Sequence, residues 1–146
     1  SIFEKVNENL LDTQGLLNST KNLYRCAEVS KLWTGAVDEK CKEITSEAQD
    51  RCAVLTLIRN QKVQPNCLRI KNADQGQCAI ASINKKGSIN FGCFKVVPLG
   101  GHCAATCIQV TDMVLPECQQ ITTVEQSICA TKSMRSKAYI DASCFE

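Results

Sequence analysis

Cysteine is the residue type with the most chemistry to offer in this chain, which holds 11 cysteines among 146 residues. Thiols form disulfides, bind soft metals or act as nucleophiles. Ten of them follow a regular spacing, in which gaps of 15 residues alternate with gaps of 11, shortened once to 10. These ten are Cys26, Cys41, Cys52, Cys67, Cys78, Cys93, Cys103, Cys118, Cys129 and Cys144. Such a density is rare in a reducing cytosol, so we expect disulfides and a secreted, extracellular protein.

The eleventh cysteine, Cys107, does not fit this spacing. It stands four residues after Cys103, at a position that the other units fill with Ser or Thr. An odd thiol in an oxidising compartment links chains, reacts or lies buried. The first hypothesis makes a second copy of the chain the partner, in a covalent dimer or polymer through Cys107. In the second, the single histidine, His102, activates a thiol or joins a metal site. Because a fourth ligand is missing, we expect neither metal nor cofactor.

The spacing belongs to an internal repeat of 26 residues. Alanine follows the first cysteine of every unit. An aliphatic residue stands four positions before every second cysteine, as Val37, Val63, Ile89, Val114 and Ile140. Coincidence in several registers at once identifies a repeat architecture.

The pattern predicts one helix for each repeat. This helix runs from the second cysteine of one unit to about six residues beyond the first cysteine of the next unit, as in residues 41–58. At 100° per residue, the cysteines, an aliphatic and the small Ser or Thr then share one face. We therefore predict an all-α, disulfide-stapled helical repeat of about six antiparallel helices. An amphipathic capping helix over residues 1–25 precedes five repeats over residues 26–146, in a single domain.

The same arrangement predicts the disulfide pairing. The first cysteine of a unit lies near the end of one helix and the second near the start of the next, so the two cysteines of each unit pair across the loop. A bond from Cys41 to Cys52 is excluded if that segment is helical, because 11 helical residues span about 16 Å. The alternative fold is a β-containing cysteine-rich repeat, favoured by Ile89-Asn90-Phe91 and by residues 94–97.

One unit departs from the others. The shortened gap, Pro98, Gly100, Gly101 and His102 all lie within residues 93–107, beside Cys107. Because proline lacks an amide donor and glycine weakens a helix, we predict a loop over residues 97–102. The single tryptophan, Trp33, is predicted to pack in the core.

Motifs of catalysis are absent from the sequence. It contains no GxSxG, phosphate-binding glycine loop, HExxH or paired CxxC, so we expect no enzyme and no catalytic residue. No apolar run approaches the roughly 20 residues that cross a bilayer, so no transmembrane segment is predicted. Asn18-Ser19-Thr20 is an acceptor for N-glycosylation.

Charge is small in sum but uneven along the chain. The net charge of +2 gives no support for nucleic acid as a partner. Residues 1–50 carry −3, residues 51–95 carry +7 and residues 96–146 carry −2, which favours a solvated face, head-to-tail association or an anionic partner.

The function expected from these features is that of a secreted, non-enzymatic structural or interaction protein that assembles through the odd cysteine. One alternative is an extracellular carrier of a small hydrophobic ligand, because aromatics make up only 5% of the chain and small aliphatics leave interior volume to fill. The other is a secreted toxin or effector.

Overall fold

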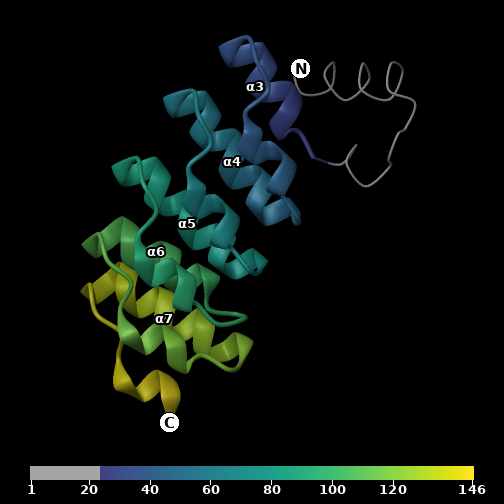
Figure 1. Ribbon diagram of the computed structural model, residues 1–146. Coiled ribbons are helices and arrows are strands. Elements are labelled where there is room, and N and C mark those ends of the chain that lie inside the picture. The colour runs from purple at the N-terminus through teal and green to yellow at the C-terminus, as the bar shows by residue number, and fades with distance from the viewer. Residues whose placement is uncertain (1–23) are drawn as a thin grey trace. The chain divides into compact units, whose positions relative to one another are not determined.

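The computed structural model describes residues 24–146, which are helical and contain no strand (Figure 1). A long α-helix and a short 3-10 helix (η) alternate along the chain: α3 (Cys26–Thr34), η1 (Glu39–Glu43), α4 (Glu47–Asn60), η2 (Pro65–Arg69), α5 (Ala73–Lys86), η3 (Phe91–Lys95), α6 (Gly101–Thr111), η4 (Pro116–Gln120), α7 (Val124–Lys137) and η5 (Ala142–Phe145). The all-α, disulfide-stapled repeat is confirmed. The β-containing alternative is wrong, because its proposed strand residues form η3 and the non-helical segments on either side of it.

Two compact units divide the chain, Ser1–Leu68 and Arg69–Glu146. The first contains α3 and α4, and the second contains α5, α6 and α7. No helix among the described residues is both long and apolar enough to span a membrane. The predicted capping helix, apart from its last two residues, and the glycosylation acceptor Asn18 lie outside the described residues.

Each repeat contains two helices where the sequence predicted one. The second cysteine of a unit lies in the 3-10 helix, and a short non-helical segment separates it from the next α-helix. The α-helix begins after an N-cap residue, Ser46, Asn72 or Thr123, whose backbone is extended and whose side-chain oxygen accepts an N–H three residues on. The single continuous helix over residues 41–58 is therefore a wrong prediction.

A glutamine in the third position of these α-helices fastens the break. The Oε1 atom of Gln75 accepts the backbone N–H of Lys71 at 2.9 Å, and its Nε2 donates to the carbonyl of Phe94 at 3.1 Å. Gln49 makes the equivalent pair of bonds in the first compact unit. One buried side-chain amide thus provides hydrogen-bond partners for a backbone N–H just before its own helix and for a backbone carbonyl of the following 3-10 helix.

In the second compact unit, the α-helices of two neighbouring repeats, α5 and α6, run in the same direction. Near the start of α5, Asp74 Oδ1 accepts the N–H of Gly101, the first residue of α6, at 2.9 Å. Near the end of α5, Lys85 Nζ donates to the carbonyl of Ile108 at 3.1 Å, close to the end of α6. Figure 1 shows α5, α6 and α7 side by side. Like ends of α5 and α6 therefore meet, and the antiparallel order predicted for successive repeat helices is wrong for this pair.

Within a repeat, the 3-10 helix runs back along the α-helix. A disulfide joins Cys129 of α7 to Cys144 of η5. One turn further along α7, the Ser133 hydroxyl accepts the N–H of Asp141, which precedes η5, at 2.8 Å. The antiparallel pair is thus formed inside each repeat, because the loop and the 3-10 helix return the chain to the start of the next α-helix.

The hydroxyl four residues after the first cysteine of a repeat bonds backbone groups where the chain turns back towards the 3-10 helix. Ser133 Oγ also donates to the carbonyl of Tyr139 at 2.7 Å, so it holds both ends of the turn before η5. Ser30 and Thr56 accept the N–H eight residues further on in the same way, at 2.8 and 3.2 Å. In these three repeats the hydroxyl caps the return of the chain beside the disulfide of its own repeat.

The core consists of aliphatic residues and cystines, and no aromatic side chain is fully buried within residues 24–146. In the first compact unit, the core cluster comprises Cys26, Val29, Ile44, Ala53, Leu57 and Val63. In the second, a cluster comprises Cys103, Cys107, Cys118, Ile121, Ala130, Met134 and Ile140. Trp33 is not in the core but 46% exposed, because it occupies a position that Arg59, Lys85 and Ser136 fill at the surface in other repeats.

Substitution of Ser133 by alanine tests the hydroxyl cap. Loss of the hydroxyl leaves the Asp141 N–H and the Tyr139 carbonyl without this partner, so we expect the free energy of unfolding to fall by about 1–3 kcal/mol. Urea unfolding with intact disulfides measures it. The matched control is Ser136→Ala, whose exposed hydroxyl bonds only carbonyls of its own helix. Equal stability of the two variants contradicts the assigned role.

Asp141 provides a test of the cap before η5 by pH. Hydrogen bonds from the Ser143 N–H and from Lys137 lower the pKa of Asp141 to about 2. Because the folded pKa lies below the usual value, its stabilising contribution is present above about pH 4 and is lost as the pH falls towards 2. An NMR titration should show the Ser143 amide shifting in that acid range. In Asp141→Asn the amide should stay constant, since Asn90 makes the same cap before η3 without titrating. A midpoint near 4 in the parent protein contradicts the assignment.

Candidate functional site

Five disulfides join the α-helix of each repeat to its 3-10 helix. The pairs are those expected from the sequence: Cys26–Cys41, Cys52–Cys67, Cys78–Cys93, Cys103–Cys118 and Cys129–Cys144. Their Cα–Cα separations all lie between 5.4 and 5.7 Å. The repeated backbone therefore places every pair within normal disulfide reach.

Cys107 lies against one of these disulfides. Its Sγ atom is 3.5 Å from Cys118 Sγ, and the sulfurs of Cys103, Cys107 and Cys118 all lie within 4.8 Å of one another. The thiol takes the place of the capping hydroxyl, because the backbone N–H of Leu115, eight residues on, bonds to it. Burial raises the pKa of the Cys107 thiol, Glu117 raises it further and the Leu115 N–H opposes the shift. The resting thiol is protonated at neutral pH.

His102 does not join this sulfur cluster. Its exposed ring places Nδ1 3.0 Å from Gln77 Nε2, on the face of α6 turned towards α5. Because Cys103 and Cys118 are bonded to each other, the cluster offers a metal one thiol only. The geometry gives no support to a thiolate activated by His102.

Cys107 is completely buried, with 0% of its surface exposed. A disulfide between chains needs both sulfurs at the surface of contact, so covalent assembly through Cys107 requires α6 and η4 to separate first. The buried-thiol alternative describes the folded state.

A second candidate site lies at the surface of the second compact unit, where Arg69 covers two phenylalanines. The guanidinium carbon of Arg69 is 4.3 Å from the Phe94 ring centroid and 5.7 Å from that of Phe91, and the two rings are 6.3 Å apart. Phe91 and Phe94 stand three residues apart in η3, a spacing that aligns side chains in a 3-10 helix. Phe91 remains 66% exposed. We call these three residues the Arg–Phe cluster.

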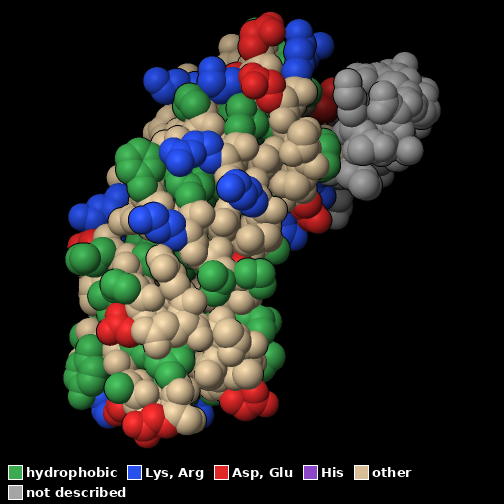
Figure 2. Space-filling model, turned by 60° about the horizontal axis from the view of Figure 1, so that its bottom comes forward, with side chains coloured by type: hydrophobic (Ala, Val, Ile, Leu, Met, Phe, Trp, Pro, Cys, Tyr) green, Lys and Arg blue, Asp and Glu red, His purple; other side chains and the backbone are tan. Residues whose placement is uncertain are grey.

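Basic side chains accumulate in the same part of the chain. In the view of Figure 2, several Lys and Arg side chains lie among hydrophobic side chains. Within the second compact unit, the exposed basic residues before α6 are Arg69, Lys71, Lys85, Lys86 and Lys95. Only Asp74 is acidic in that stretch, so the surroundings of the Arg–Phe cluster are positively charged.

The last α-helix, α7, carries an exposed apolar surface beside an acidic side chain, in contrast to the basic surroundings of the Arg–Phe cluster. Val124 and Ile128, one turn apart in α7, are 55% and 51% exposed, and Glu125 lies beside them. The same two positions in α4 are Glu47 and Arg51, which form an ion pair at 3.2 Å. α7 therefore presents an apolar pair, with an adjacent carboxylate, where another repeat has paired charges.

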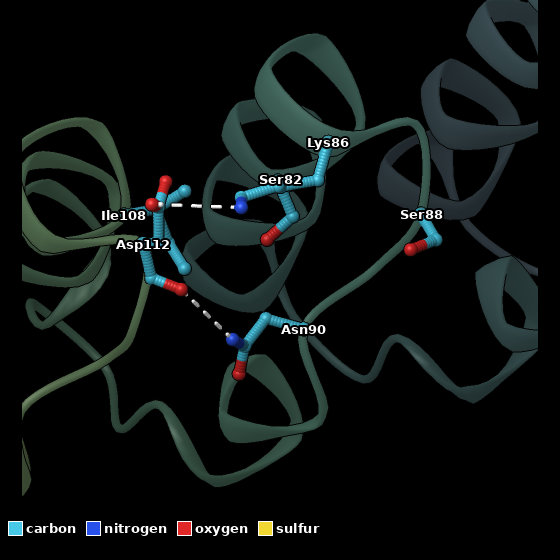
Figure 3. Close-up of a pocket in the computed structure, with 6 residues that line it drawn as sticks. All are labelled: Ser82, Lys86, Ser88, Asn90, Ile108 and Asp112. Carbon is cyan, nitrogen blue, oxygen red and sulfur yellow. Dashed lines mark hydrogen bonds and ion pairs between the residues drawn. The ribbon is translucent and has the colours of Figure 1, made fainter.

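A pocket of about 270 Å³ opens between the ends of α5 and α6 (Figure 3). Its lining is mostly polar: Ser82, Lys86, Ser88, Asn90, Ile108 and Asp112. In Figure 3, Lys86 and Asn90 both point towards Asp112. A hydrogen bond from Lys85 lowers the pKa of Asp112 and keeps its carboxylate ionised. This is no apolar cavity for a hydrophobic ligand.

Comparison with known proteins gives no relative: no family model, curated protein or solved structure matches the chain. The Arg–Phe cluster was not identified from the sequence. Its signal is the pair of phenylalanines three residues apart in the basic segment, which on the sequence alone supported only the alternative, β-containing fold.

The burial of Cys107 has a direct test by thiol labelling. The native protein should not react with a water-soluble maleimide at neutral pH, and one thiol should become reactive after denaturation without reduction. Intact mass spectrometry counts the labels. A cysteine introduced by Ser136→Cys in α7, which is exposed, serves as the positive control in the native state. Rapid native labelling of Cys107 contradicts the buried position.

Proposed function

We propose that this chain is a secreted, non-catalytic structural or interaction protein that associates head to tail with further copies of itself. The observation that carries the proposal is the exposed Arg–Phe cluster, Arg69 over Phe91 and Phe94. Association is non-covalent, since Cys107 is buried.

Secretion is supported by the chemistry of the chain. Five disulfides persist only in an oxidising compartment, and each closes a segment with a sequence separation of 15 residues. In the chain-entropy model, a loop of this size contributes about 3 kcal/mol per bond. A molecule fastened in every repeat resists unfolding and proteolysis outside the cell.

The composition of the Arg–Phe cluster supports a binding role. Arginine and aromatic residues are enriched at interfaces and dominate their hot spots. A phenylalanine that is two thirds exposed gains only a small part of its burial energy in the isolated chain. A guanidinium already stacked on the rings loses little side-chain entropy when a carboxylate partner approaches.

The partner surface with matching chemistry is α7 of another copy. Val124 and Ile128 offer exposed aliphatic contacts to the rings, and Glu125 offers a carboxylate to Arg69. The sign of the charge agrees, because residues 51–95 carry +7 and residues 96–146 carry −2. Since the two surfaces differ, their contact is heterologous and builds open chains or rings of molecules.

The carrier hypothesis receives less support, because the pocket between α5 and α6 is polar. A non-catalytic role is favoured because many polar side chains of the repeat hold backbone groups. The Ser/Thr hydroxyls cap turns, the glutamines fasten the helix starts and Asp50 accepts the N–H groups of Arg25 and Cys26 at the start of α3.

Sedimentation velocity tests the proposal over a range of protein and salt concentrations. The parent protein should form species larger than the monomer as its concentration rises, and added salt should weaken them. The double variant Arg69→Glu with Phe91→Ser should remain monomeric. Lys31→Glu reverses an exposed charge on α3 and should associate like the parent protein.

Mixing two variants tests the head-to-tail geometry. The double variant Val124→Ser with Ile128→Ser should also be monomeric alone. Mixed with the Arg69/Phe91 variant, it should form heterodimers only, because each copy then retains one of the two surfaces. A parent protein that stays monomeric at millimolar concentration contradicts the proposal, as does a mixture that forms no dimer while the parent associates.

A further inference from the structure

The repeat that contains Cys107 holds three sulfurs where the others hold two. Cys107 Sγ lies 3.5 Å from Cys118 Sγ, and the latter is bonded to Cys103. The position follows from the repeat itself, since Ser82, at the same place in α5, puts its hydroxyl 3.4 Å from Cys93 Sγ. A thiol replaces a hydroxyl beside the second cysteine, and a sulfur can attack a disulfide where an oxygen cannot.

We propose that Cys107 exchanges with this disulfide, so that the repeat has two alternative pairings, Cys103–Cys118 and Cys107–Cys118. The Cys107 thiol gives up its proton and attacks Cys118 Sγ. The Cys107–Cys118 bond forms as the Cys103–Cys118 bond breaks, and the electron pair leaves on Cys103, which takes up a proton. One thiol and one disulfide are present before and after, so the step needs neither oxidant nor reductant.

The start of α6 favours Cys103 as the leaving group. α6 begins at Gly101, so Cys103 is its third residue, whereas the first cysteine of α4, α5 and α7 is the sixth. Thiolates are stabilised in the first turn of a helix by unpaired N–H groups and the helix dipole, and a more stable thiolate leaves faster. The shortened gap and the odd cysteine thus both favour exchange of the Cys103–Cys118 bond.

The late start of α6 has a structural cause. Pro98 and Leu99 form a turn, and Gly101 places its N–H on Asp74. A Cβ atom at Gly101 would lie 2.8 Å from that carboxylate oxygen, too close for any other residue without displacement. The loop predicted over residues 97–102 therefore ends at Gly100, and the helix that follows is shorter than its neighbours.

The exchange moves the attachment of η4 along α6. Cys107 follows Cys103 by four residues, so the bond shifts by about one helical turn, roughly 6 Å. The closed segment shortens from a sequence separation of 15 to one of 11. Because the sulfurs of Cys107 and Cys118 already lie 3.5 Å apart, the second pairing needs only a small movement of η4 and shifts its attachment from the start of α6 towards the middle.

Two matched variants test the proposal. Cys103→Ser removes the native partner of Cys118 and leaves Cys107 beside it, while Cys129→Ser removes the partner of Cys144 in a repeat with Ser133 at that position. After air oxidation of the folded chains and maleimide labelling in denaturant, Cys103→Ser should carry no label and Cys129→Ser should carry two. Peptide mapping should find the Cys107–Cys118 bond. Two labels on a folded Cys103→Ser chain overturn the proposal.

The parent protein supplies a second measurement that does not depend on folding of a variant. Native protein kept at mildly alkaline pH is quenched in acid, denatured, labelled and mapped. Label on Cys103 as well as on Cys107 supports the exchange, and label on Cys107 alone contradicts it. Cys107→Ser, which restores the repeat, should show no label on Cys103.

Discussion

The bond between the α-helix and the 3-10 helix of each repeat is the constraint on which the structure depends. A five-residue 3-10 helix has no stability of its own, and a repeat with few large apolar side chains buries little surface per residue. The disulfide fixes the pair, and the adjacent hydroxyl satisfies the backbone where the chain turns back. The repeat can therefore be short, with its core formed largely from the cystines themselves.

The spacing of the cysteines predicted the helical fold and the pairing, because disulfide reach limits which residues of a helix can bond. Sequence reasoning failed where the structure depends on hydrogen bonds between distant backbone groups. Nothing in the local pattern shows that Gln75 reaches the carbonyl of Phe94, or that a new helix begins after Asn72. The wrong prediction of helix direction had the same cause. Successive helices alternate in direction if each repeat contains one helix, whereas a second helix in each repeat returns the chain and lets neighbouring α-helices run in parallel.

Of the candidate site residues, Cys107 could be found from the sequence and the Arg–Phe cluster could not. Cys107 was conspicuous because a repeat exposes any position that breaks it, and its burial follows from the buried hydroxyls that it replaces. The Arg–Phe cluster breaks no rule of the repeat, because the positions of η3 at the surface vary freely between units. Its meaning depends on Arg69 stacking across a sequence separation of more than 20 residues, which only the folded chain brings about.

The tendency to associate follows from the residues at the outer positions of the repeat. Repeats of this kind tolerate different residues on their outer positions, so function is added by substitution at the surface rather than by a cleft. Val124 and Ile128 replace an ion-pairing position, and Phe91 replaces a position held by Glu39, Pro65, Pro116 and Ala142 in the other repeats. Both changes leave apolar surface exposed, and burial of that exposed surface stabilises only a complex with another molecule.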